Sequence, residues 1–219
     1  MDLYDVMRST AAVREFTGDP LPDDTLHRIL DHARFAPSGG NRQGTRVIAV
    51  RDRQTRERLA ELNKTAARRY AAQIRAGQSP WNPLEPPVPT AEEIAATDPP
   101  PHLTESLLRA DVALVVCVDL GLVAAMDQDL DRIGLVSGAS VYPLVWNILL
   151  AARSEGFGGT ITTMAVAEEP AVRDLLGIPE QFAVAAVVPL GKPAKQLTKL
   201  KRRPVEEFVT RERFDGEPL

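Results

Sequence analysis

Apolar and polar positions alternate along the chain in patterns that predict helices separated by buried strands. The apolar residues between 26 and 33 recur at helical spacing, which predicts a helix from about Asp23 to Phe35. Other predicted helices cover residues 2–10, 53–76, 91–96, 103–109 and 168–176, and predicted strands cover 46–51, 111–118, 159–163 and 183–190. This alternation predicts an α+β fold in which helices wrap a central mixed or antiparallel sheet.

A long uncharged stretch predicts one further helix, from Asp127 to Arg153. Residues 133–152 carry no charge, which raises the question of a membrane span. Glycine, serine, proline and asparagine residues dilute the apolar character, so the pattern favours a core helix that is buried on all sides. Its small residues would let another helix approach closely, and a second subunit could supply that helix.

Prolines gather in one segment of the chain. Of the 18 prolines, eight lie between Pro80 and Pro101. Proline lacks an amide donor and disfavours helix at the preceding residue, so this segment is predicted to be irregular apart from the short helix at 91–96. We predict a single domain over residues 1–219, with a proline-rich insertion or lid at about 77–105.

Composition and charge exclude several function classes. The 219 residues carry a formal charge of −4 and are 44% hydrophobic, which is typical of a soluble globular protein. An acidic balance gives no general reason to bind nucleic acid or an anionic membrane. The single cysteine, Cys117, cannot form an internal disulfide, and the acidic start is not a secretory signal, so a cytoplasmic location is predicted. The three histidines show no metal-ligand spacing, and no metal is predicted.

Four stretches could carry chemistry. Arg8, Ser9 and Thr10, followed by Arg14, place hydroxyls and guanidinium groups at a helix end, where they could hold a phosphate or could simply cap the helix. The stretch 36–43 (APSGGNRQ) offers backbone amides beside glycines together with neutral donors and acceptors, which suits a heteroaromatic edge, although a plain connecting loop is the alternative.

The other two stretches lie in the second half of the chain. Residues 156–162 (GFGGTIT) resemble part of a dinucleotide glycine loop, but they lie between a helix and a strand and lack the third glycine, so a Rossmann site is excluded. A strand of this kind could still lie along a planar ring. Residues 199–203 (KLKRR) could bind an anion or form a solvated tail. Because no nucleophile and base are paired, no catalytic side chain is predicted and a bound cofactor would do the chemistry.

Taken in order, these stretches resemble the nitroreductase family of FMN-dependent oxidoreductases. The resemblance rests on VREF at 13–16, PLP at 20–22, the run through APSGGNRQ at 36–43, GFGG at 156–159, PLGKP at 189–193 and RPVEE at 203–207. It covers most of the chain except about residues 77–105.

The resemblance implies an intertwined homodimer with two FMN sites at the subunit interface. From one subunit, the FMN phosphate and ring would be contacted by Arg8, Ser9, Thr10 and Arg14, and the phosphate also by Lys201 and Arg202. From the other subunit, the site would receive Pro37, Ser38, Gly39 and Asn41, with Gln43 near the ring. The edge of the ring would be lined by Gly159, Thr160, Ile161 and Thr162. NAD(P)H would reduce the flavin, and a nitroaromatic, quinone or other electrophile would then take the electrons in a ping-pong cycle.

The proline-rich segment would then lie over the flavin. It makes Trp81, Asn82, Leu84 and His102 possible substrate contacts, with a surface excursion as the alternative. Two other functions stay open, a flavin-binding protein without turnover and a specialised flavin-dependent dehydrogenase. The chain also departs from the family where Ala11 and Ala12 stand in place of an Arg-Arg-Ser run, and where Gly44-Thr45 follow Gln43.

Overall fold

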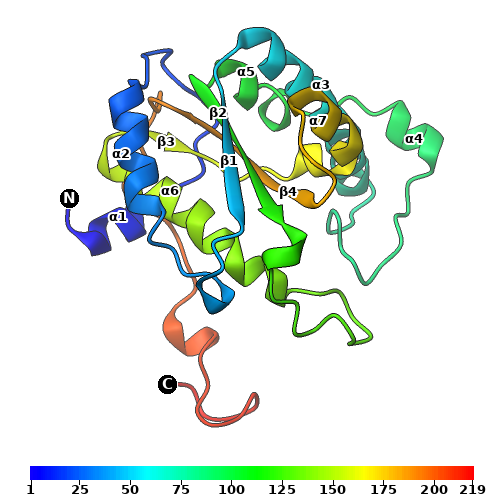
Figure 1. Ribbon diagram of the computed structural model, residues 1–219. Coiled ribbons are helices and arrows are strands. Elements are labelled where there is room, and N and C mark those ends of the chain that lie inside the picture. The colour runs from blue at the N-terminus through cyan, green and yellow to red at the C-terminus, as the bar shows by residue number, and fades with distance from the viewer.

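A four-stranded antiparallel sheet forms the centre of the computed structural model, which describes residues 1–219 (Figure 1). The strand order is β1-β2-β4-β3. The strands are β1 (Thr45–Val50), β2 (Val112–Asp119), β3 (Gly158–Gly159) and β4 (Phe182–Gly191). The α+β prediction is confirmed, and all strand pairs are antiparallel.

Helices cover both faces of this sheet. One core cluster packs Val112 and Leu114 of β2 against α2 (Asp23–Ala33) and α6 (Tyr142–Ser154). The alternate side chains of β2 belong to a second cluster with α3 (Arg53–Arg75) and α7 (Glu169–Leu176). Because both faces are covered, β2 is a continuous apolar run and not an alternating one. None of the helices combines the length and apolar character that crossing a bilayer requires.

The proline-rich segment is irregular, as predicted, apart from one short helix. The remaining helices are α1 (Leu3–Ser9), α4 (Ala91–Ala95) and α5 (Ser106–Arg109). Helix α4 begins with a capping box, in which Thr90 and Glu93 exchange side-chain and backbone hydrogen bonds. Around α4 the chain runs as loops beyond the end of α3 (Figure 1).

The predicted helix from Asp127 to Arg153 is wrong over its first half. Only α6 is α-helical there, and a 3₁₀ turn at Val136–Ser140 precedes it. Pro143 lies in the first turn of α6, which is the position that proline favours. The prediction of burial on all sides is also wrong, because Tyr142 and Trp146 are 44% and 41% exposed.

Asp127 explains why the chain before α6 forms a loop. Its buried carboxylate accepts the backbone N–H of Leu135 at 2.7 Å and the guanidinium of Arg132 at 2.8 Å. It also accepts the N–H of Val136 at 3.3 Å. The bond from the Leu135 amide, followed by that from Arg132, lowers the pKa of Asp127 to about 2. These bonds compete with the helical arrangement that the uncharged sequence favours.

The Asp127 carboxylate makes the free energy of unfolding depend on pH in the acidic range. Its pKa in the folded state lies below the unfolded value of about 3.9, so its contribution is present above about pH 4 and is lost as the pH falls toward 2. We expect the free energy of unfolding of the wild type to fall more steeply over this window than that of Asp127→Asn, as measured by urea denaturation at each pH. Parallel curves for the two proteins would contradict the assignment.

Candidate functional site

The segment after β3 is not the continuous strand that was predicted for residues 159–163. Gly158 and Gly159 pair with β4, and pairing resumes only at an isolated bridge between Thr162 and Val187. The other edge of β3 is occupied by the segment before Arg14, since the Val13 N–H donates to the Gly159 carbonyl at 2.8 Å. Between these attachments the backbone N–H groups of Thr160 and Ile161 donate no hydrogen bond within the chain. Two amides are therefore available to an outside acceptor.

These amides lie beside Arg14. A cavity of about 120 Å³ is lined by Arg14, Thr160, Ile161 and Thr162, with His102 at the same cavity. Arg14 is exposed and makes no ion pair. No carboxylate lines this cavity, and the Arg14 guanidinium gives it positive charge. The structure thus brings together four of the predicted ring contacts and one predicted substrate contact.

The hydroxyls at the end of α1 are already occupied within the chain. The Ser9 Oγ donates to the Asp5 carbonyl at 2.6 Å, and the Thr10 Oγ1 donates to the Val6 carbonyl at 2.7 Å. The Ser9 Oγ also accepts the Nε–H of Arg153 at 3.1 Å, across 144 positions of sequence. Arg8 is exposed and its side chain makes no hydrogen bond or ion pair, which leaves its guanidinium free.

Arg153, which the sequence analysis did not single out, lies beside the end of α1. It lines a narrow crevice together with Thr10, Gly159 and Gln196, and the Gln196 amide donates to the Ser9 carbonyl at 3.2 Å. The only sequence signal was its position as the first charge after the long uncharged stretch. Arg153 places a cation where Ala11 and Ala12 replace the basic run of the family.

The loop at residues 37–43 lines a second cavity together with α2, β1 and α6. Pro37, Ser38 and Gln43 line a space of about 270 Å³, to which Ser140 also contributes. The Ser38 Oγ accepts the Gln43 N–H at 3.0 Å, and the Gly39 N–H donates to the Ser140 Oγ at 3.0 Å. Asn41 and Gln43 have φ of 52° and 51°, a left-handed conformation that is uncommon for residues other than glycine. Such strain is typical of functional loops.

The remaining predicted residues are more dispersed. Lys201 and Arg202 are exposed on the C-terminal tail, which runs past α6 and away from the sheet (Figure 1). Trp81 lines a cavity against α3, whereas Asn82 and Leu84 line neither that cavity nor the one that contains Arg14. Gly39 and Asn41 lie in the loop beside the second cavity, not on its lining.

The residues present fit FMN. The ring edge needs hydrogen-bond donors, and the unpaired amides of Thr160 and Ile161 supply them beside the Arg14 cation. The phosphate needs cations, and Arg8 and Arg153 lie at the end of α1. FMN is itself an anion, and neither cavity carries a carboxylate in its lining that would repel it.

Comparison with known proteins agrees with this chemistry. The model of the nitroreductase family matches residues 7–192. The chain therefore belongs to the nitroreductase family, whose members are FMN-dependent oxidoreductases that use NAD(P)H. Its flavin-dependent oxidoreductase character follows from this membership.

Individual relatives and solved structures extend over nearly the whole chain. A protein named NADH dehydrogenase from Thermus thermophilus is 29% identical over 203 residues, which cover 90% of both chains. Human iodotyrosine deiodinase 1 is 21% identical over 219 residues, covering 95% of this chain and 68% of the human protein. The crystal structure of nitroreductase A from Vibrio parahaemolyticus superposes with a TM-score of 0.68 at 21% identity, covering 98% of this chain and 77% of that one.

Proposed function

We propose that this protein uses NAD(P)H and bound FMN to reduce a nitroaromatic, a quinone or another electrophilic small molecule. The observation that carries the proposal is the cavity in which Arg14 lies beside the unpaired amides of Thr160 and Ile161. The amides of Thr160 and Ile161 and the Arg14 guanidinium would hold the ring of FMN, which when bound would supply two-electron redox chemistry between NAD(P)H and the acceptor. Arg14 would stabilise the negative charge that the ring gains on reduction.

We further propose that the complete site needs two copies of the chain. Within one copy the loop at residues 37–43 and Arg14 line different cavities, so a single chain supplies the two halves at separate places. Tyr142 and Trp146 of α6 are partly exposed, and Phe214 of the tail is fully exposed. A partner copy would cover such apolar surface. Lys201 and Arg202 of the tail would then reach the FMN phosphate. We also propose that the whole chain is a single domain and that the protein works in the cytoplasm.

Flavin binding and turnover can be tested in one preparation. We expect the purified protein to be yellow, with flavin absorbance that NADH or NADPH bleaches under anaerobic conditions. A second addition, of 2-methyl-1,4-naphthoquinone (menadione), nitrobenzene or 3-iodo-L-tyrosine, should restore the absorbance if that compound is an acceptor. The last compound is included because iodotyrosine deiodinases are among the relatives.

The alternatives give different results in the same experiment. A protein that binds flavin but is not bleached by either nicotinamide would be a flavin carrier. A flavin that is bleached by an organic substrate and reoxidised by oxygen would indicate a specialised dehydrogenase. A colourless protein that does not take up added FMN would rule out all three.

A further inference from the structure

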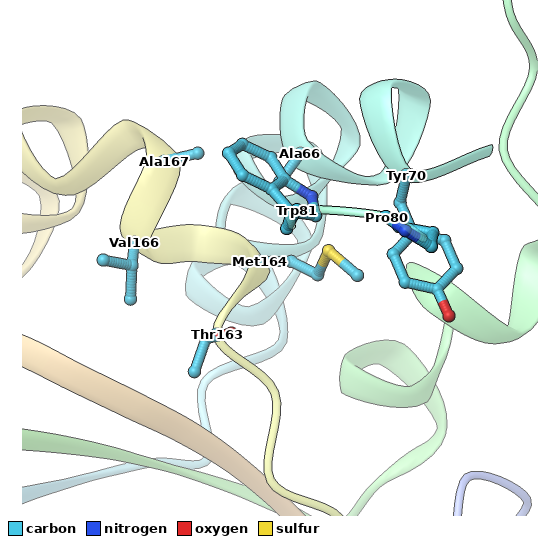
Figure 2. A pocket seen from close by; sticks show the side chains of 8 residues that line it. All are labelled: Ala66, Tyr70, Pro80, Trp81, Thr163, Met164, Val166 and Ala167. Atoms are coloured by element: carbon cyan, nitrogen blue, oxygen red, sulfur yellow. The ribbon is translucent and has the colours of Figure 1, made fainter. Parts of the chain in front are cut away.

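A large apolar cavity lies between helix α3 and the proline-rich segment. It has a volume of about 580 Å³, which is in the range of sites for small organic molecules (Figure 2). Three elements line it: α3, the turn at Pro80 and Trp81, and the 3₁₀ turn at Met164–Glu168 with the residue before it. Six of its eight lining residues are hydrophobic and none is charged: Ala66, Tyr70, Pro80, Trp81, Thr163, Met164, Val166 and Ala167.

This cavity adjoins the one that contains Arg14. Thr163 and Met164 line both of them. A molecule in the apolar cavity would therefore lie next to the segment at residues 160–162, along which the proposed function places the flavin ring. The inference below rests on that proposed function for the source of electrons, but not for the cavity itself.

Trp81 is held in an unusual conformation at the wall of this cavity. Its φ is 57°, which is sterically unfavourable for a bulky residue. Its backbone N–H donates at 3.1 Å to the side-chain oxygen of Gln73, which is only 1% exposed. The guanidinium of Arg69 lies 4.0 Å from the centre of the indole ring, in a cation–π contact. Two side chains of α3 thus fix both the backbone and the ring of Trp81.

The chemistry of the lining favours a flat aromatic ligand without charge. In Figure 2 the Met164 thioether lies between the Trp81 indole and the Tyr70 ring. Aromatic rings stack on such surfaces, and a thioether makes favourable contacts with them. A charged ligand would lose its hydration in this cavity without meeting an opposite charge.

We propose that Trp81 is the residue that selects the electron acceptor, and that the acceptor is an uncharged, planar aromatic molecule held against the indole. Gln73 and Arg69 act as positioning residues, because they contact Trp81 and do not line the cavity. The selection of the acceptor then depends on helix α3, because its side chains hold Trp81 of the proline-rich segment in place.

Steady-state kinetics with two acceptors test this role. In Trp81→Ala we expect the KM for menadione to rise about tenfold, with kcat changed less than twofold. The KM for ferricyanide, a charged ion that cannot stack, should stay unchanged. Trp81→Phe should recover most of the affinity for menadione, and Arg69→Met should raise its KM by a smaller factor than Trp81→Ala. The control is Val88→Ala, which truncates a 68% exposed side chain of the same segment. An unchanged KM for menadione in Trp81→Ala would overturn the proposal.

A binding measurement separates this proposal from the proposed function. The chain has two tryptophans, so Trp146→Phe leaves Trp81 as the only one. We expect menadione, added to the oxidised Trp146→Phe protein without nicotinamide, to quench Trp81 fluorescence to a saturating limit. Quenching that rises linearly without saturation would show that the cavity does not bind the quinone. Because no electrons are transferred, this result is independent of whether NAD(P)H bleaches the flavin.

Discussion

Gly159→Ala is expected to destabilise the protein by about 3 kcal/mol and to abolish stable FMN binding. A β-carbon at Gly159 would overlap the carbonyl oxygen of Pro189 and lie 2.6 Å from the Leu190 Cδ2. The first of these is backbone in the central strand β4, which cannot move without disturbing the sheet. Strand β3 would have to separate from β4, and the segment at residues 160–162 would move with it. For a chain of this length the loss corresponds to a fall in Tm of roughly 6–12 °C, which thermal unfolding would detect.

Gly134→Ala is the matched control for this substitution. Its nearest neighbour is the Asp127 Oδ1, at 3.8 Å, so the added methyl group meets only an ordinary contact. We expect its stability to stay within about 0.5 kcal/mol of the wild type. If Gly159→Ala lowered Tm but kept its flavin, the segment after β3 would not be the ring edge. If the Tm of Gly159→Ala equalled that of the wild type, Gly159 would not pack as closely against the β4 backbone as the structure indicates.

The regular elements were predictable because local pattern and tertiary packing agree in them. Strand β2 is an apolar run between polar ends, and α3 begins at an aspartate whose carboxylate accepts the Thr55 N–H at 2.7 Å. Residues 127–141 were not predictable in this way. From residue 133 onward they carry no charge, which is compatible with a helix, and only the buried carboxylate of Asp127 and the placement of Pro143 reveal that α6 begins late.

The site was partly predictable for a related reason. Arg14 and Thr160 stood out because they belong to short local motifs, and the fold brings those motifs to one cavity. Arg153, Gln73 and Arg69 did not, since each is an ordinary polar residue of a helix whose role depends on a partner elsewhere in the chain. Arg153 meets Ser9 across 144 positions, and no local pattern encodes such a contact.

Arg14→Ala is expected to lower the reduction potential of the bound flavin and to slow its reduction by NAD(P)H about tenfold. Arg14 lines the cavity beside Thr160 and has no carboxylate partner, so its charge is free to act on the ring. Loss of a charged hydrogen-bond donor costs about 1.5–3 kcal/mol, which for two electrons corresponds to roughly 30–65 mV. The affinity for oxidised FMN should change less, because the extra negative charge appears only on reduction. Potentiometric titration and anaerobic stopped-flow absorbance measure the two effects.

Two further variants show whether charge alone accounts for the effect. Arg14→Lys keeps the cation but loses the planar guanidinium, so we expect it to retain most of the potential and part of the rate. Arg58→Ala removes an exposed arginine of α3 that makes no ion pair, and it should match the wild type in both measurements. A potential in Arg14→Ala equal to that of the wild type would place Arg14 away from the ring. The charge that stabilises the reduced flavin would then have to come from another cation of the proposed site.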